Sequence, residues 1–179
     1  NIIDVGASDG IASKFFNRNL NTKTIICFEP NKYYFNKLKK MNIKNLIIKP
    51  FAIGNINGYK TVFFPRYKFF NINLDLPSYT YYNKKILIER LSLDFKFRKN
   101  ISIIKKKIFI KKVKKINKKI DLIKIDTNGF ELPVIKGLLH IIKQDRPALI
   151  IELNEDEKKI EKLLKKFSYK AYYYSTDMK

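Results

Sequence analysis

The chain is poor in several residue types that often carry chemistry. Its 179 residues contain no tryptophan, one cysteine and one histidine. The single cysteine, Cys27, excludes an internal disulfide, and its apolar neighbours predict a small buried core residue. The histidine, His140, lies in the middle of a predicted helix, where we expect no catalytic role. Because no cluster of histidine, cysteine and carboxylate residues has the spacing of a metal-ligand set, we predict no bound metal.

Long apolar runs are also missing. No stretch approaches the roughly 20 apolar residues that a membrane-spanning helix requires, and nothing resembles a signal peptide. We therefore expect a cytoplasmic protein without a transmembrane segment. The length fits one domain of about 100 to 200 residues. The chain opens directly on an apolar run and stops soon after the segment AYYYS at 171–175. We therefore expect a fragment that lacks N-terminal residues and that ends near or before the closing strand of its fold.

Acidic residues are also scarce. The chain has 16 Asp and Glu but 38 Lys and Arg, which gives a formal net charge of +22. Such a field attracts nucleic acid, anionic membranes or acidic glycans. The sequence is also rich in Asn, Ile, Phe and Tyr and prefers Lys to Arg, which is typical of AT-rich coding. We favour this compositional origin of the charge. The basic run at 105–119 interleaves lysines with apolar residues, a pattern expected of a solvent-facing strand edge as well as of a nucleic-acid patch.

What the sequence does contain is an alternation of short apolar strands and helical stretches. Strands are predicted at 2–5, 24–30, 45–54, 58–64, 121–129 (ending in a turn), 147–153 and 169–175. Helices are predicted from about residue 11 and at 31–41, 130–144 and 156–167. This alternation predicts an α/β fold with a mostly parallel, doubly wound sheet and helices on both faces. Residues 65–107 break the rhythm, and we predict a variable insertion there on the substrate side.

The first strand leads into a glycine turn, DVGASDG at 4–10. Its spacing fits neither the G-x-G-x-x-G of dinucleotide-binding folds nor a P-loop, since no lysine follows Gly10. Such a corner leaves backbone N–H groups of the helix start free for a ligand. Asp4 at the strand end repels a pyrophosphate but suits a ligand with positive charge, such as S-adenosylmethionine. The second strand ends near Glu29, where a carboxylate can accept both hydrogens of a ribose diol.

Five segments, in this order and spacing, resemble the FkbM family of S-adenosylmethionine-dependent methyltransferases: DVGASDG, FEP, KPFAIG, LIKIDTNGFELPVIKG and RPALIIEL. The resemblance covers most of the chain and implies one methyltransferase domain over 1–179, with a class I, Rossmann-like fold. It implies that Glu29 holds the ribose hydroxyls of the cofactor and that Phe51 and Ala52 lie beside its adenine. It also implies a loop under the methionine part of the cofactor, formed by Asp4, Gly6, Ala7, Ser8 and Gly10.

The chemistry of methyl transfer limits which chemical groups are expected to accept the methyl. Methyl transfer from a sulfonium is an in-line displacement, in which the protein mainly aligns the nucleophile. A hydroxyl acceptor also needs its proton removed by a positioned base. The D/N-P-P-aromatic loop of amino-methylating enzymes is missing, so we expect O-methylation of a hydroxyl on a sugar, a glycan or a small metabolite. Two alternatives stay open: a nucleic-acid methyltransferase or basic nucleic-acid-binding protein, and a domain that binds the cofactor without turnover.

The strand and turn at 121–129 carry the catalytic candidates. Asp126 ends a strand that we expect beside the first one, at the mouth where open α/β sheets bind ligands, so it is our candidate for the group facing the methyl. The alternative is a carboxylate that caps the following helix. Asn128 is either a turn residue or a hydrogen-bonding partner of the substrate. Glu131 is placed to serve the first helical turn, and Glu152 ends the next strand, facing either cofactor or solvent.

Overall fold

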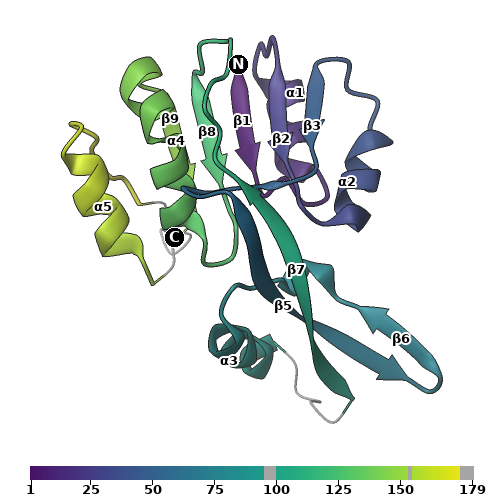
Figure 1. Ribbon diagram of the computed structural model, residues 1–179. Coiled ribbons are helices and arrows are strands. Elements are labelled where there is room, and N and C mark those ends of the chain that lie inside the picture. The colour runs from purple at the N-terminus through teal and green to yellow at the C-terminus, as the bar shows by residue number, and fades with distance from the viewer. Residues whose placement is uncertain (95–99, 153–154, 174–179) are drawn as a thin grey trace, which may run out of the picture.

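The centre of the protein is a parallel sheet of five short strands (Figure 1). The computed structural model describes residues 1–94, 100–152 and 155–173. The strands lie in the order β3-β2-β1-β8-β9. Their bounds are β1 (Ile2–Val5), β2 (Ile25–Phe28), β3 (Leu46–Lys49), β8 (Leu122–Ile125) and β9 (Ala148–Ile151). All of the neighbouring pairs are parallel, which confirms the predicted fold class.

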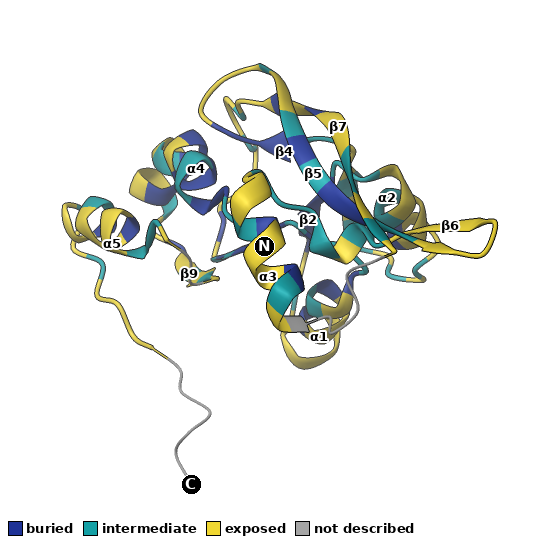
Figure 2. Ribbon diagram, turned by 90° about the horizontal axis from the view of Figure 1, so that it is seen from below, coloured by how far each residue is buried: buried dark blue, intermediate teal, exposed yellow. Residues whose placement is uncertain are grey.

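Helices cover both faces of this sheet, and α1 and α4 lie on opposite sides of it (Figure 2). The helices are α1 (Ile11–Asn19), α2 (Lys32–Lys39), α4 (Glu131–Asp145) and α5 (Glu157–Lys165). Side chains alternate across a strand, so β1 sends Ile2 into the core under α1 and α2, and Ile3 and Val5 into the core under α4. Burial on both faces explains why the central strands β1 and β2 are almost wholly apolar.

A second sheet, in the order β4-β7-β5-β6, stands beside the first. Its strands are β4 (Ala52–Ile53), β5 (Gly58–Phe69), β6 (Ile72–Asp75) and β7 (Ile101–Lys111). Strand β5 pairs antiparallel with both β6 and β7. The base of this sheet joins the core under α4, whereas its outer part extends away from the central sheet as a ribbon (Figure 1). A 3-10 turn, η1 (Pro77–Tyr79), and helix α3 (Lys84–Asp94) connect β6 toward β7.

The structure corrects two predictions about individual elements and shows which elements a third segment holds. The segment 45–54, predicted as one strand running into a turn, is two strands in different sheets, since the pairing with β2 ends at Lys49 and Ala52 then pairs with β7. Residues 65–107, which show no clear period, hold the outer half of β5, β6, η1, α3 and the start of β7. The alternation there is obscured by Pro65 inside β5 and by the lysine run inside β7.

The other correction concerns the strand predicted at 169–175. Residues 169–173 form no strand, and 174–175 lie outside the described residues. After α5 the backbone turns at Ser168, which has a φ of 60°. The Tyr169 hydroxyl then donates to the carbonyl of Pro147 at 2.9 Å, which holds the segment against the start of β9 rather than along it. None of the helices within the described residues is both long and apolar enough to cross a membrane.

Candidate active site

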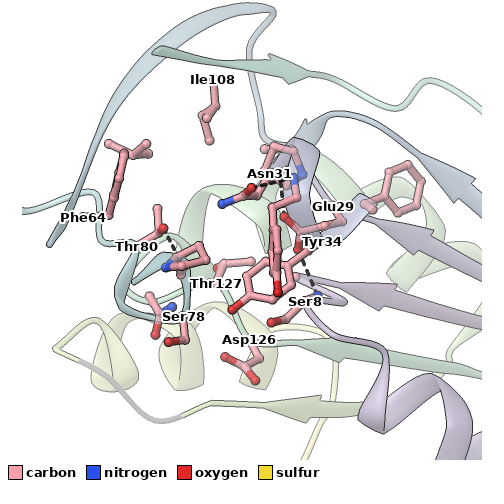
Figure 3. Close-up of a pocket in the computed structure, with 18 of the residues that line it drawn as sticks. Ser8, Glu29, Asn31, Tyr34, Phe64, Ser78, Thr80, Ile108, Asp126 and Thr127 are labelled. Carbon is pink, nitrogen blue, oxygen red and sulfur yellow. Dashed lines mark hydrogen bonds between the residues drawn. The ribbon is translucent and has the colours of Figure 1, made fainter. Parts of the chain in front are cut away.

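A cleft of about 670 Å³ lies where the carboxyl ends of β1, β2 and β8 meet the second sheet. Figure 3 shows Ser8 and Glu29 on one side of it, Ser78 and Thr80 on the other, and Asp126 between them. Ligand pockets of this size commonly hold a nucleoside-sized molecule. Of the residues proposed from the sequence, the cleft is lined by Gly6, Ser8, Glu29, Ala52, Asp126 and Asn128.

The loop after β1 is tightly folded under the cleft. Gly6 and Ser8 have φ values of 74° and 47°, a region that glycine adopts freely and other residues rarely. A Cβ on Gly6 would stand 1.9 Å from the carbonyl oxygen of Asp126, so the two strand-end loops touch at this point. Two N–H groups of this turn are used inside the fold: Gly6 donates to the carbonyl of Phe28 and Gly10 donates to the carbonyl of Ala7.

Glu29 closes the same loop from the neighbouring strand. Its side chain is buried, with 5% of its surface exposed. One carboxylate oxygen accepts the Ser8 N–H at 2.9 Å and the other accepts the Asn31 N–H at 2.7 Å. Burial raises the pKa of Glu29, and these two N–H groups oppose that rise. Each oxygen of a carboxylate has a second acceptor position, so Glu29 can still accept hydroxyl hydrogens from a ligand in the cleft.

Asp4 lies one layer below the cleft, on the face of β1 that α1 covers. It is fully buried, accepts the Ser13 hydroxyl at 2.7 Å and lies 3.4 Å from the ammonium of Lys124. The register pairs Asp4 with Lys124 directly across β1 and β8. Asp4 therefore supports the loop from beneath. Its other neighbour, Cys27, is a buried core residue as predicted, and burial followed by the charge of Asp4 raises its pKa to about 12.

Lys124, which the sequence analysis did not single out, connects the groups beneath the cleft. Its ammonium donates to the carbonyl of Gly6 at 3.0 Å and lies 3.2 Å from a carboxylate oxygen of Asp126. Burial lowers the pKa of Lys124, but Asp4 and Asp126 raise it by more, and the net direction is upward. The available sequence signal was a single lysine inside the apolar strand LIKI, on a strand expected next to Asp4.

The loop after β8 presents Asp126, Thr127 and Asn128 to the cleft. The Asp126 side chain is 46% exposed and pairs with Lys124, and helix α4 has no side-chain cap at its N-cap residue. The capping alternative for Asp126 therefore finds no support. Glu131 serves this turn instead, because it accepts the N–H and hydroxyl of Thr127 at 2.7 and 2.8 Å and the N–H of Gly129 at 3.1 Å.

The carboxyl group of Glu152 faces Asp126 and is also exposed to solvent. Partial burial, then the charge of Asp126 and a hydrogen bond with it, raise the pKa of Glu152 to about 7. Glu152 does not line the cleft. His140 is exposed on α4 and also lies away from the cleft. Among the described residues, no group of three or more His, Cys, Asp and Glu could hold a metal ion.

The opposite wall comes from the second sheet and from the 65–107 segment. Tyr82 stacks on Phe130, with ring centroids 4.0 Å apart. Burial, and then the charges of Glu29 and Glu131, raise the pKa of Tyr82, so its hydroxyl stays protonated. Several further residues of this segment line the cleft, namely Asp75, Pro77, Ser78, Thr80 and Lys106. Tyr34 of α2 lines the cleft as well.

Four of the proposed cofactor residues do not line the cleft: Asp4, Ala7, Gly10 and Phe51. Ala7 and Gly10 shape the loop from within, since the Gly10 N–H donates to the Ala7 carbonyl at 2.9 Å. Phe51 packs edge-on against Phe28, with ring centroids 5.4 Å apart. A role in cofactor binding stays a prediction for these four residues.

We compared the sequence and the structure of the chain with those of known proteins. Residues 4–174 match the family described as the methyltransferase FkbM domain. No curated protein sequence matches the chain. The crystal structure of a methyltransferase FkbM from Methylobacillus flagellatus KT is similar, with a TM-score of 0.56 and 16% identity over 93% of this chain. The match spans 36% of that longer chain, and at this identity it shows a shared fold. By its match over 4–174, the chain belongs to the FkbM methyltransferase family.

Proposed function

We propose that the protein is an S-adenosylmethionine-dependent methyltransferase that methylates a hydroxyl group on a sugar, a glycan or a small metabolite. The observation that carries the proposal is the pairing of the Gly6–Ser8 turn with the buried carboxylate of Glu29 at the ends of two adjacent parallel strands. In open α/β sheets, ligands bind outside the carboxyl ends of the strands, and an acid at this place accepts ribose hydroxyls.

The residues of the cleft fit this cofactor. Glu29 would hold the ribose diol, and Ala52 and Phe28 offer an apolar surface for the adenine. The methionine part would lie over the Gly6–Ser8 turn, whose tight fold requires glycine at position 6 because a Cβ there would meet the Asp126 carbonyl. When bound, S-adenosylmethionine supplies an electrophilic methyl group on a sulfonium.

The acceptor side of the cleft is built for a hydroxylated molecule. Ser78 and Thr80 place hydroxyl groups opposite Glu29 (Figure 3). Asp126 lies between the two walls and is proposed to orient the acceptor hydroxyl or to take its proton, and Asn128 is proposed to donate to the same molecule. Lys124 holds the Asp126 carboxylate in place from below. Orientation of this kind contributes several kcal/mol to methyl transfer.

Glu29→Ala tests the cofactor assignment. Hydrogen bonds to a charged group contribute about 1.5 to 3 kcal/mol, so we expect calorimetry to show S-adenosylmethionine bound about 10- to 150-fold more weakly. The matched control is Glu89→Ala, which changes an exposed glutamate on α3 outside the cleft. An unchanged dissociation constant in Glu29→Ala would reject the role of Glu29.

A second measurement separates loss of the ribose contact from loosening of the loop. S-adenosylhomocysteine and its 2′,3′-dideoxy analogue are titrated into the wild type and into Glu29→Ala. We expect the wild type to prefer the analogue with both hydroxyls by about tenfold or more, and the variant to lose this preference. Equal preferences in both proteins would mean that Glu29 only supports the Ser8 and Asn31 backbone.

A further inference from the structure

The outer part of the second sheet is a two-faced ribbon. Residues opposite each other on antiparallel strands share a face, and successive residues alternate between faces. The register pairs Phe69 with Ile72 and Tyr67 with Leu74, and Tyr67 also pairs with Ile101 of β7. One face is therefore apolar over three strands; we call it the ribbon face, formed by Tyr67, Phe69, Ile72, Leu74 and Ile101.

The opposite face of the same strands is polar. Arg66 pairs with Asp75 across β5 and β6, with two hydrogen bonds of 2.5 and 3.2 Å between guanidinium and carboxylate. Lys68 lies opposite Asn73, and both are exposed. The ribbon is thus amphipathic by the period-2 rule, with its apolar side facing away from this ion pair.

Nothing in the described part of the chain covers the ribbon face at its tip. Phe69, Ile72 and Leu74 are 50%, 58% and 49% exposed, and Phe70 at the turn is 82% exposed. The Phe69 ring lies 4.8 Å from that of Phe70 and 6.5 Å from that of Tyr67, so the exposed groups form one continuous patch. Figure 2 shows the projecting β6 end exposed along its length. Patches of this kind mark interaction surfaces.

The charges around this patch favour an anionic partner. The three strands β5, β6 and β7 carry seven Lys and Arg against the single acid Asp75, which pairs with Arg66. Lys68 lies at the tip itself, whereas the run 105–107 lies farther along the ribbon, opposite residues 61–63. Aromatic and aliphatic side chains beside lysines match a lipid bilayer, in which the apolar groups enter the acyl boundary and the lysines meet phosphate headgroups. Nucleic acid would use the lysines and aromatic rings but would gain little from Ile72 and Leu74, which have no face for base stacking.

We propose that the tip of this ribbon, Phe69–Leu74, binds the surface of membranes that contain anionic lipids. The inner part of the same strands lines the cleft with Phe64, Lys106 and Ile108. Membrane contact at the tip would therefore hold the cleft at a fixed place near the lipid surface. If the proposed function is correct, this arrangement favours acceptors carried on lipids; the membrane contact itself does not depend on that function.

Co-sedimentation with vesicles tests the proposal. The full chain is mixed with vesicles of phosphatidylcholine alone and with vesicles containing 30% phosphatidylglycerol as an added component, a composition chosen as roughly that of an anionic membrane surface. We expect binding to the anionic vesicles and a fall of about tenfold or more in the partition coefficient for the double variant Phe70→Ser, Ile72→Ser. The matched control is Tyr59→Ser, Ile56→Ser, which removes residues of similar exposure, 72% and 60%, away from the tip.

The absence of tryptophan from the chain gives a direct reporter. In Phe70→Trp the new side chain is the sole indole, and we expect its emission to shift to shorter wavelength on addition of anionic vesicles. Because the altered residues are exposed, thermal unfolding should show all variants folded. The proposal is overturned if the wild type does not bind vesicles, if tip and control variants bind alike, or if the indole emission does not move.

Two other occupants of the ribbon face would also overturn the membrane proposal. A dimer in sedimentation velocity that Phe70→Ser, Ile72→Ser abolishes would assign the ribbon to a second copy of the chain. Binding to single-stranded RNA that the same double variant weakens as strongly as it weakens vesicle binding would assign it to nucleic acid. We expect neither effect.

Discussion

At the scale of residues, the floor of the cleft depends on three charges from two adjacent strands. A carboxylate as fully buried as Asp4 is costly without a counter-charge, and Lys124 supplies one from the directly opposite position on β8. The same ammonium binds the Gly6 carbonyl and pairs with Asp126. Asp4 thus lies behind the loop and does not line the cleft, whereas Asp126 does.

Asp126→Asn tests whether that exposed carboxylate takes part in the reaction. The amide keeps the size of the side chain and loses its ability to accept a proton, and positioned bases contribute about 10²- to 10⁴-fold. We expect turnover to fall by at least about 10²-fold, with little change in cofactor affinity. Turnover is followed as S-adenosylhomocysteine release, using a hydroxylated acceptor found in a panel of sugars and small metabolites.

The control for this prediction is Asp156→Asn, which makes the same chemical change at the start of α5, outside the cleft. The comparison also includes thermal unfolding, since Asp126→Asn loses an ion pair with Lys124. A folded Asp126→Asn enzyme with near-normal turnover would leave catalysis to alignment alone. An unfolded variant would show that the ion pair serves stability, which also contradicts the prediction.

At the scale of elements, the sequence predicted well wherever burial is two-sided. The apolar strands and the amphipathic helices of the central sheet were placed within a few residues, because the central strands β1 and β2 are buried on both faces and the helices bury one apolar side. The second sheet was harder to predict, since β5 and β7 are long, partly exposed and interrupted by Pro65 and by lysines. Residues such as Ser78 and Thr80 reach the cleft through the pairing of distant strands, which leaves no local pattern in the sequence.

The contact between α4 and the turn after β4 is close enough to predict the effect of one added methyl group on stability. A Cβ on Gly137 of α4 would lie 2.4 Å from the carbonyl oxygen of Gly54, in the turn that joins β4 to β5. Gly→Ala inside a helix normally stabilises by roughly 0.5 to 1 kcal/mol. Here the added carbon meets backbone that cannot rotate away, so we expect Gly137→Ala to destabilise by about 1 to 3 kcal/mol. Chemical denaturation measures the difference.

The neighbouring substitution Lys136→Ala is the control, because it changes an exposed position on the same helix turn. Surface changes of this kind stay within about 0.5 kcal/mol of the wild type. A Gly137→Ala variant as stable as the wild type, or more stable, would contradict the prediction. It would mean that α4 has room to move away from the turn between β4 and β5.

At the scale of the whole molecule, the scarce acids are concentrated at the cleft. Over the chain, basic residues outnumber acidic ones by 38 to 16. Among the residues that line the cleft the order is reversed, with Asp9, Glu29, Asp75 and Asp126 against Lys37 and Lys106. Further acids, Asp4 and Glu131, are buried just behind that lining. The lining of the cleft is therefore more acidic than the chain as a whole, which disfavours the phosphates of a nucleic acid inside it.

This distribution yields a prediction about the charge of +22. If the lysines follow from composition rather than from selection for an anionic polymer, they bind RNA through scattered phosphate contacts only. We then expect a dissociation constant for random-sequence RNA no tighter than about 10⁻⁶ M at physiological salt, the range of non-specific binding. Fluorescence anisotropy over a series of salt concentrations measures both the affinity and its slope.

The decisive part of this experiment is competition. An RNA held at the cleft would weaken S-adenosylmethionine binding or compete for the acceptor side, whereas lysines elsewhere on the surface would not, because the acids of the cleft repel phosphate and the Debye length is only about 8 Å at physiological salt. We therefore expect the affinity for S-adenosylmethionine to be the same with and without saturating RNA. A nanomolar RNA affinity with a steep salt slope and mutual exclusion of RNA and cofactor would instead make nucleic acid the acceptor, since only a polymer seated over the cleft could produce all three effects together.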